Sequence, residues 1–242
     1  MSAPSEPSRS NIQTFSSSGA IEQYADRATG DLFVQEREVV ERYFGDSGRV
    51  LDLGCGSGRV THNLSGMGYD VVGLDPSGAM VETAAAAHPG LPLTIGDATA
   101  LPFRDGVFDY AVFAFYGLDY VHPESNRLRA LGEIRRVLAP GGLFVFSSHN
   151  TWNALASLPF DGVDAVRPLL ECEHVSDLWN RYAPVEVSVG ETLAYFSSPA
   201  KQRRQLRRCG LDLLAVVGKR NSPLRYLEYA LHYVARKPAD GR

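Results

Sequence analysis

The chain has 242 residues, of which 44% are hydrophobic and 21% are charged, and its formal net charge is −4. This length suits one α/β domain with or without a small lid, and the composition permits a sizeable core. The net acidity argues against binding of nucleic acid or anionic membranes through overall charge. The first ten residues are polar, and the longest apolar stretch, 110–118, is about half of the roughly 20 residues in a membrane span. A cytoplasmic protein without membrane segments is expected.

The three cysteines, Cys55, Cys172 and Cys209, lie far apart along the chain. The sequence has no C-x-x-C pair and no Cys/His cluster with zinc spacing. We therefore expect no metal site and no disulfide framework, which fits a reducing compartment.

The amino-terminal segment divides into two parts. Residues 1–18 are rich in serine and proline, which predicts a flexible tail. From residue 21 to residue 44 apolar side chains recur at roughly helical spacing, which predicts one or two helices in front of the first strand, within residues 19–45. Tyr24 belongs to this helical region.

The predicted first strand, residues 49–53, holds a short apolar run over 50–53 that one acid, Asp52, interrupts. Glycine follows at every second position, Gly54, Gly56 and Gly58, and then a helical pattern to Met67. Strand, glycine turn and helix form the opening unit of a Rossmann-like sheet. Glycine has no Cβ, so the backbone can turn tightly and a ligand can lie directly against it. The helix start behind the turn presents free N–H groups. By itself, such a turn is a weak signal.

Four further strands alternate with helices, with strands over 70–74, 91–95, 108–113 and 143–147 and helices over 77–88 and 126–138. This alternation predicts an α/β fold with a doubly wound, mostly parallel, seven-stranded sheet. Residues 150–185 break the pattern and carry several aromatic side chains, which we interpret as an inserted cap. The later elements are a strand over 186–196, a helix over 199–209, and strands over 211–218 and 231–235. The last two are expected to pair antiparallel at the sheet edge, and residues 19–242 to form a single domain.

Two acids follow strands at positions where ligands bind in such sheets. Asp75 ends the second strand, about 20 residues after the glycine turn, where a carboxylate can accept both ribose hydroxyls of a nucleoside cofactor. Asp97 follows the third strand.

Four ordered segments resemble the motifs of class I S-adenosylmethionine-dependent methyltransferases. Residues 52–58, Asp-Leu-Gly-Cys-Gly-Ser-Gly, match (D/E)-x-G-x-G-x-G, and residues 75–80 resemble the D-x-S-x-x-M continuation. Residues 96–103 resemble G-D-A-x-x-L-P-F, and residues 136–142 resemble R-x-L-x-P-G-G, the turn before the fifth strand. The resemblance covers about two fifths of the chain. On this ground the chain is identified as a member of the family.

The resemblance implies roles for particular residues. Asp75 would bind the ribose, Met80 would pack on the adenine, Asp97 would take the adenine amino group, and Asp52 would hold the methionine amino group through water. Arg59 would lie near the carboxylate or be solvated. The complete set expected at the cofactor, S-adenosylmethionine, is Tyr24, Asp52, Gly54, Cys55, Gly56, Gly58, Asp75, Pro76, Met80, Asp97, Ala98, Ala114 and Phe115.

The sulfonium of this cofactor makes its methyl group electrophilic, and the transfer is an in-line displacement in which the protein mainly supplies alignment. An acceptor that carries a proton also needs a base. The candidates follow the fourth and fifth strands, at the sheet edge where ligands bind. They are Tyr116, His122 and His149 as catalytic residues, with Asp119 beside them.

The predicted substrate is a small molecule that is methylated on oxygen or nitrogen. Residues 114–117 read Ala-Phe-Tyr-Gly, unlike the (D/N)-P-P-(Y/F) motif of enzymes that methylate exocyclic or amide nitrogens, and an aromatic cap would enclose a partly apolar acceptor. The oligomeric state stays open, with a homodimer as one option.

Three alternatives remain. An RNA methyltransferase would use the basic run in residues 201–208, although the net acidity and the absence of aromatic platforms weigh against it. A protein that binds the cofactor without catalysis would serve as a sensor or partner module. An oxidoreductase for a nicotinamide dinucleotide is disfavoured by the tighter glycine spacing and by the lack of a Tyr-x-x-x-Lys pair.

Overall fold

The computed structural model describes residues 6–153, 180–187, 190–219 and 222–239. These residues form one nine-stranded sheet, whose main path runs β3-β2-β1-β4-β5-β7-β6, while β9 pairs with β5 and β8. The strands are β1 Arg49–Leu53, β2 Asp70–Asp75, β3 Leu93–Ile95, β4 Phe108–Phe113, β5 Leu138–Asn150, β6 Asn180–Val187, β7 Gly190–Ser197, β8 Asp212–Val217 and β9 Ala230–Arg236. The predicted doubly wound, mostly parallel sheet is confirmed.

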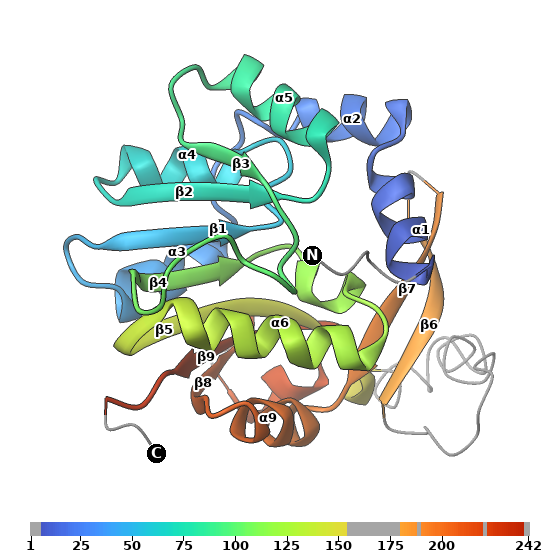
Figure 1. Ribbon diagram of the computed structural model, residues 1–242. Helices are drawn as coiled ribbons and strands as arrows, with labels where there is room; N and C mark the ends of the chain where they lie inside the picture. The colour runs from blue at the N-terminus through green and yellow to red at the C-terminus, as the bar shows by residue number, and fades with distance from the viewer. Residues whose placement is uncertain (1–5, 154–179, 188–189, 220–221, 240–242) are drawn as a thin grey trace.

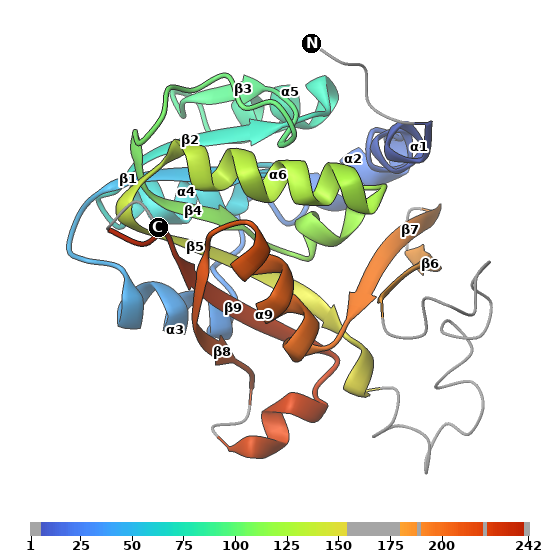
Figure 2. The ribbon, with the colours of Figure 1, turned by 60° about the horizontal axis from the view of Figure 1, so that its bottom comes forward.

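Helices cover both faces of the sheet. They are α1 Glu6–Phe15, α2 Ser18–Ala25, α3 Val34–Tyr43, α4 Arg59–Gly66, α5 Gly78–Ala87, α6 Glu124–Val137 and α9 Pro199–Arg208, with 3-10 helices η1 Gly117–Tyr120 and η4 Pro223–Leu227. Figures 1 and 2 show α6 and α9 on one face and α3 on the other. None of the described helices combines the length and the apolar character that crossing a bilayer requires.

The alternation of side chains along β1 explains why both faces need helices. Leu51 and Leu53 are fully buried in the cluster that includes Leu131 of α6. Val50, which precedes Leu51, points to the opposite face and packs in a cluster with Val60 of α4. Successive side chains of a strand point to opposite faces, so a central strand flanked by β2 and β4 is buried on both.

The antiparallel edge is also as predicted. β9 pairs antiparallel with β5, from Leu143↔Arg236 to His149↔Ala230, and β8 pairs antiparallel with β9.

The sheet forks at the carboxyl end of β5. β4 ends at the Phe113↔Phe146 pair, and β7 pairs parallel with the two last residues of β5, His149 and Asn150. β6 pairs antiparallel with β7 along its full length. The prediction of a single strand over 186–196 is therefore wrong, and so is the count of seven strands, because residues 180–197 hold a hairpin that joins the sheet. Residues 154–179 of the predicted cap lie outside the described residues.

The prediction of a flexible tail over residues 1–18 is also wrong, because most of this segment forms helix α1. Its residue Asn11 is buried and binds the backbone of β7 and of η1. The Asn11 amide accepts a hydrogen bond from Leu193 N at 2.9 Å and donates to the Leu193 and Tyr120 carbonyls, each at 2.9 Å. Figure 1 shows α1 beside β7, beyond the carboxyl ends of the parallel strands.

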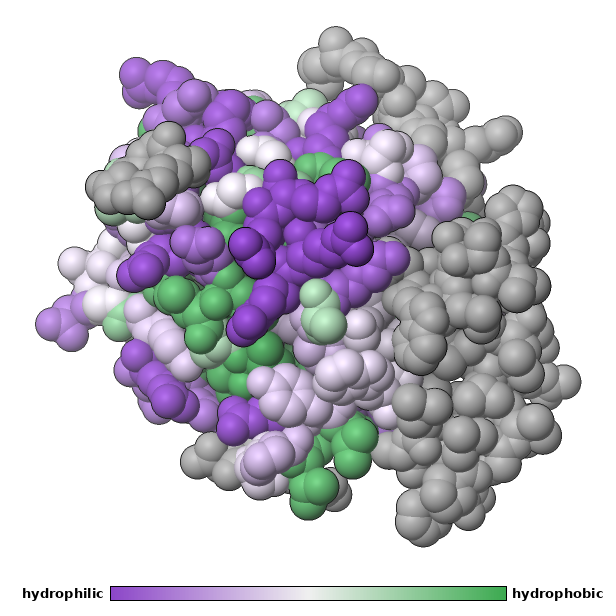
Figure 3. Space-filling model, turned by 90° about the horizontal axis from the view of Figure 1, so that it is seen from below, coloured by the Kyte–Doolittle hydropathy of each residue, from purple (hydrophilic) through white to green (hydrophobic). Residues whose placement is uncertain are grey.

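The basic run of the sequence lies on α9, whose inner face carries buried Leu206 and Gln202. Its exposed residues are Arg203, Arg204, Arg207 and Arg208. In Figure 3 this side of the molecule is broadly hydrophilic beside an apolar area. The arrangement is that of an exposed basic helix face around the inward Leu206.

A buried ion pair fixes η1 against the end of β5. Arg127 of α6 and Asp119 of η1 are both fully buried, and the guanidinium donates to the carboxylate at 3.0 Å and to the Leu118 carbonyl at 2.6 Å. The same carboxylate accepts from the Ser148 hydroxyl and from the His149 backbone, at 2.9 and 2.8 Å. Breaking such a fully satisfied buried network is costly, so the residues of η1 are held firmly in place.

Candidate functional site

The site begins with the turn between β1 and α4. Gly54, Gly56 and Gly58 all have positive φ, at 60°, 53° and 85°, which is costly for residues with a Cβ. At Gly54 the reason is also steric, because a Cβ there would lie 2.8 Å from the Phe113 ring of β4. At Gly58 a Cβ would meet Ala84 of α5 at 3.2 Å, so this glycine lets two helices approach.

Asp75, the last residue of β2, ties this turn to the start of α5. One carboxylate oxygen accepts from Gly56 N at 2.9 Å, and the other accepts from Ser77 N at 2.8 Å. The Ser77 hydroxyl in turn caps α5 by accepting from Met80 N. Burial raises the pKa of Asp75, and the two backbone hydrogen bonds partly offset this. Each oxygen keeps a lone pair for a further donor.

Asp52 lies under the same turn and is 1% exposed. It accepts a hydrogen bond of 2.6 Å from the Thr61 hydroxyl of α4. Burial raises the pKa of Asp52 to about 7, while the Thr61 hydrogen bond and the charge of Arg59 act in the opposite direction.

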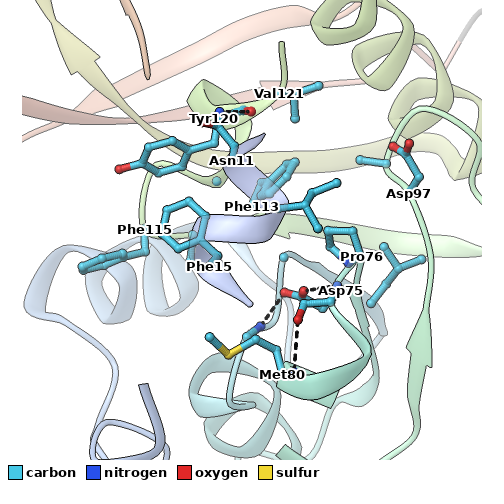
Figure 4. A pocket seen from close by; sticks show the side chains of 18 of the residues that line it. Asn11, Phe15, Asp75, Pro76, Met80, Asp97, Phe113, Phe115, Tyr120 and Val121 are labelled. Atoms are coloured by element: carbon cyan, nitrogen blue, oxygen red, sulfur yellow. Dashed lines mark hydrogen bonds between the residues drawn. The ribbon is translucent and has the colours of Figure 1, made fainter. Parts of the chain in front are cut away.

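A cavity of about 170 Å³ opens where β1, β2 and β4 end. With its open, solvent-filled mouth included, the empty space is about 1020 Å³. Figure 4 shows Asp75, Pro76 and Met80 on one side of the cavity and the rings of Phe15 and Phe115 on another, with Asp97 apart from both. The cavity therefore has a polar end and an aromatic end.

Most of the residues predicted at a cofactor meet here. The cavity wall includes Tyr24, Gly54, Gly56, Asp75, Pro76, Met80, Asp97, Ala98, Ala114 and Phe115. Asp52 and Cys55 line an adjoining hollow, which shares Tyr24 and Phe115 with the main cavity. Gly58 lines neither space and serves the packing of α4 on α5.

Two arginines line the adjoining hollow, and they differ in whether a carboxylate binds the guanidinium. Arg59 is bound to Glu36 through two hydrogen bonds, of 2.7 and 2.9 Å, and lies over the Phe33 ring. Arg27 lies over the rings of Tyr24 and Phe115, and among the described residues its guanidinium has no carboxylate partner. Arg27, which the sequence did not single out, is thus the more available cation.

The predicted catalytic residues lie outside both spaces. Tyr116 stacks on His149, with ring centroids 4.3 Å apart, and burial raises the pKa of Tyr116 to about 12. His149 is 2% exposed and its Nδ1 lies 2.9 Å from the Asp119 carboxylate. Burial lowers the pKa of His122. Asp119 itself is part of the buried network and is not exposed to a ligand.

The sequence did not indicate the cavity-lining residues that come from α1 and η1. Asn11, Ile12 and Phe15 come from α1, and Tyr120 comes from η1. The apolar Ile12 and Phe15 belong to the segment taken as a tail, and nothing local in the sequence indicates that Asn11 binds β7.

Residues 51–146 match the family described as methyltransferase domain. Over 103 residues the chain is 43% identical to a demethylmenaquinone methyltransferase of Beutenbergia cavernae, which covers 43% of this chain and 41% of that protein. A demethylmenaquinone methyltransferase of Streptomyces avermitilis is 42% identical over 106 residues, or 44% of its length. The chain thus spans less than half the length of these curated relatives.

Solved structures are similar over most of the chain. A crystal structure of a SAM-dependent methyltransferase from Methanosarcina mazei has a TM-score of 0.69 at 22% identity and covers 87% of this chain and 100% of its own. A second crystal structure is that of the 1,6-didemethyltoxoflavin-N1-methyltransferase of Burkholderia thailandensis with bound 1,6-didemethyltoxoflavin and S-adenosylhomocysteine. It has a TM-score of 0.63 at 17% identity and covers 98% of this chain and 93% of its own. At these identities the likeness shows the fold.

Asp52 makes a testable contribution to stability. Its pKa is about 7 in the folded chain and about 3.9 in an unfolded one, so the folded state binds the extra proton between these values. The free energy of unfolding should therefore fall as pH rises from about 4 to about 7, by at most about 1.4 kcal/mol per pH unit from this group. Asp52→Asn removes this slope, so its stability relative to the wild type should grow between pH 5 and pH 8 in urea titrations. Parallel pH dependences of the two proteins would contradict the assignment.

Proposed function

From the class I S-adenosylmethionine-dependent methyltransferase domain that this chain carries, we propose that it transfers a methyl group to an oxygen or nitrogen of a small molecule. The observation that carries the proposal is the Asp75 carboxylate, which is tied to the glycine turn and faces the same cavity as Asp97. The covered end of such a cavity suits a small acceptor better than a polymer.

The residues present fit this cofactor. Asp75 is 8% exposed, and each of its oxygens has a lone pair beyond those bound by Gly56 and Ser77, so it can accept from ribose hydroxyls. Met80 is buried in the wall beside it, where an apolar thioether can pack on a purine. The space that a Cβ of Gly56 would take is open, which leaves room for close approach to the backbone.

When bound, the cofactor supplies an electrophilic methyl group on a sulfonium. The chain contributes binding, alignment and exclusion of water at the carboxyl ends of β1, β2 and β4. The rings of Phe15 and Phe115 lie at the end of the cavity opposite Asp75, where an acceptor would be held.

Calorimetry with S-adenosylhomocysteine and with NADH tests the cofactor directly. Binding of the first and not of the second is expected. Turnover is then measured as formation of S-adenosylhomocysteine with a panel of small hydroxyl and amine acceptors; cofactor binding with no turnover on any acceptor would favour a binding module.

Asp75→Asn should weaken S-adenosylhomocysteine by about tenfold to a hundredfold, because a charged hydrogen-bond acceptor is lost. Asp70→Asn is the matched control, since Asp70 starts the same strand and pairs with Arg49 at the surface. Calorimetry on both folded variants decides the question. Equal affinity of the Asp75 variant and the wild type would remove the ribose role.

Arg27 is proposed to bind the carboxylate of the methionine moiety, because it borders the hollow beside Asp52 while Arg59 is engaged by Glu36. Arg27→Met should weaken S-adenosylhomocysteine by about fivefold, the size of an exposed ion pair. Binding of 5′-methylthioadenosine, which has no carboxylate, should change less than twofold. An equal loss for both compounds would show that Arg27 acts only through packing on Tyr24.

His149 is proposed as the proton acceptor for an acceptor hydroxyl or amine. The Asp119 carboxylate accepts from its Nδ1, which leaves Nε2 as the basic nitrogen, and its ring neighbours Tyr120 of the cavity wall, with centroids 6.4 Å apart. His149→Gln should lower turnover by about a hundredfold. S-adenosylhomocysteine affinity should not change, and exposed His62→Gln is the control. Unaltered turnover of the His149 variant would exclude the role.

A further inference from the structure

The aromatic end of the cavity is built from four rings that contact one another in an arc. Phe15 and Tyr120 have centroids 4.9 Å apart at 68°, Phe15 and Tyr24 are 6.2 Å apart at 74°, and Tyr24 and Phe115 are 6.3 Å apart at 88°. These edge-to-face contacts fix the orientation of each ring. The rings come from α1, α2, η1 and the segment after β4, so four elements converge on this end.

The described side chains that line this end of the cavity are uncharged. The charged side chains that line the described cavity are Asp75 and Asp97, which lie at and beyond the polar end. The amides of Asn11 and Asn126 are bound to backbone carbonyls, that of Asn11 to Leu193 and Tyr120 and that of Asn126 to His122. Arg27 lies over the rings of Tyr24 and Phe115 but lines the adjoining hollow, where it is assigned to the cofactor carboxylate. A charged acceptor would therefore find no further counter-ion among the described lining residues and would lose its hydration.

Two tyrosine hydroxyls supply the polar character of the aromatic end. Among the described residues, no group forms a hydrogen bond with the hydroxyl of Tyr24 or with that of Tyr120. Tyr24 also borders the hollow beside Asp52 and lies under Arg27, which places it toward the methionine end. Tyr120 lines the main cavity but not the adjoining hollow. It belongs to η1, which the Arg127–Asp119 ion pair holds in place.

The Tyr120 hydroxyl is a donor. Burial, together with the nearby Tyr24 and Asp119, raises the pKa of Tyr120, so the phenol stays protonated at neutral pH. A protonated phenol with no partner in the wall offers its hydrogen to an oxygen of the bound molecule.

We propose that the acceptor is a neutral, planar aromatic compound with an oxygen substituent, and that Tyr120 selects it by donating a hydrogen bond to that oxygen. The inference rests on the proposed methyl transfer and names the substrate class of the same cavity. Aromatic faces and edges of Phe15, Phe115 and Tyr120 favour a flat ring over a saturated one of equal size.

The test compares 2-naphthol with its saturated counterpart 2-decalol, using the protein saturated with S-adenosylhomocysteine. Both probes carry one hydroxyl on two fused six-membered rings, so they differ in planarity and aromatic character. Calorimetry should give at least about tenfold tighter binding of 2-naphthol. Equal binding of the two probes would overturn the proposal.

Tyr120→Phe should weaken 2-naphthol by about three- to tenfold, the effect of one neutral hydrogen bond, and leave S-adenosylhomocysteine within twofold. Tyr226→Phe is the matched control, because Tyr226 is an exposed tyrosine of η4 outside the cavity. Unchanged affinity of the Tyr120 variant for 2-naphthol would overturn its selecting role.

These measurements separate the choice of acceptor from methyl transfer itself. If S-adenosylhomocysteine binds and neither ring compound does, the aromatic acceptor is wrong and methyl transfer to another class of acceptor stands. If S-adenosylhomocysteine itself does not bind, the proposed function falls first.

Discussion

The arrangement of the cavity depends on one carboxylate. Asp75 ends β2 and accepts hydrogen bonds from Gly56 and from Ser77, so it joins the glycine turn after β1 to the first turn of α5. Burying a carboxylate without hydrogen-bond donors costs free energy. Here both donors are backbone amides, so the backbone of the turn and of α5 must keep one geometry to bind it. The same carboxylate thus shapes the polar end of the cavity and presents its remaining lone pairs to it.

The sequence predicts the polar end of the cavity well, because its residues follow from local backbone geometry and from where the strands end. The turn over residues 54–58 needs positive φ at three glycines, and the acids at the end of β2 and just after β3 follow from where parallel strands end. Strand and helix alternation placed these segments in one sheet, and burial on both faces of β1 explains its apolar run, which only Asp52 interrupts.

The aromatic end could not be predicted in the same way, because it depends on contacts between distant segments. Asn11 binds Leu193, 182 positions away, and this contact docks a helix whose composition suggested a tail. Arg127 and Asp119 are charged residues that a sequence pattern places at the surface, and they are fully buried because each satisfies the other and the backbone of η1. Arg59, expected near a ligand or in solvent, is engaged by Glu36.

The hairpin of β6 and β7 joins the parallel sheet through only two residue pairs, at His149 and Asn150. Its own strands are paired with each other over their whole length, and β7 is held further by Asn11 of α1 and by Gln205 of α9, which donates to the Tyr195 hydroxyl. In evolution such an appendage can be lengthened, shortened or replaced while the nucleoside-binding half of the protein keeps its geometry. Divergence of acceptor preference among related chains should therefore concentrate in this attachment and in α1 that rests on it, and not in the strands beneath.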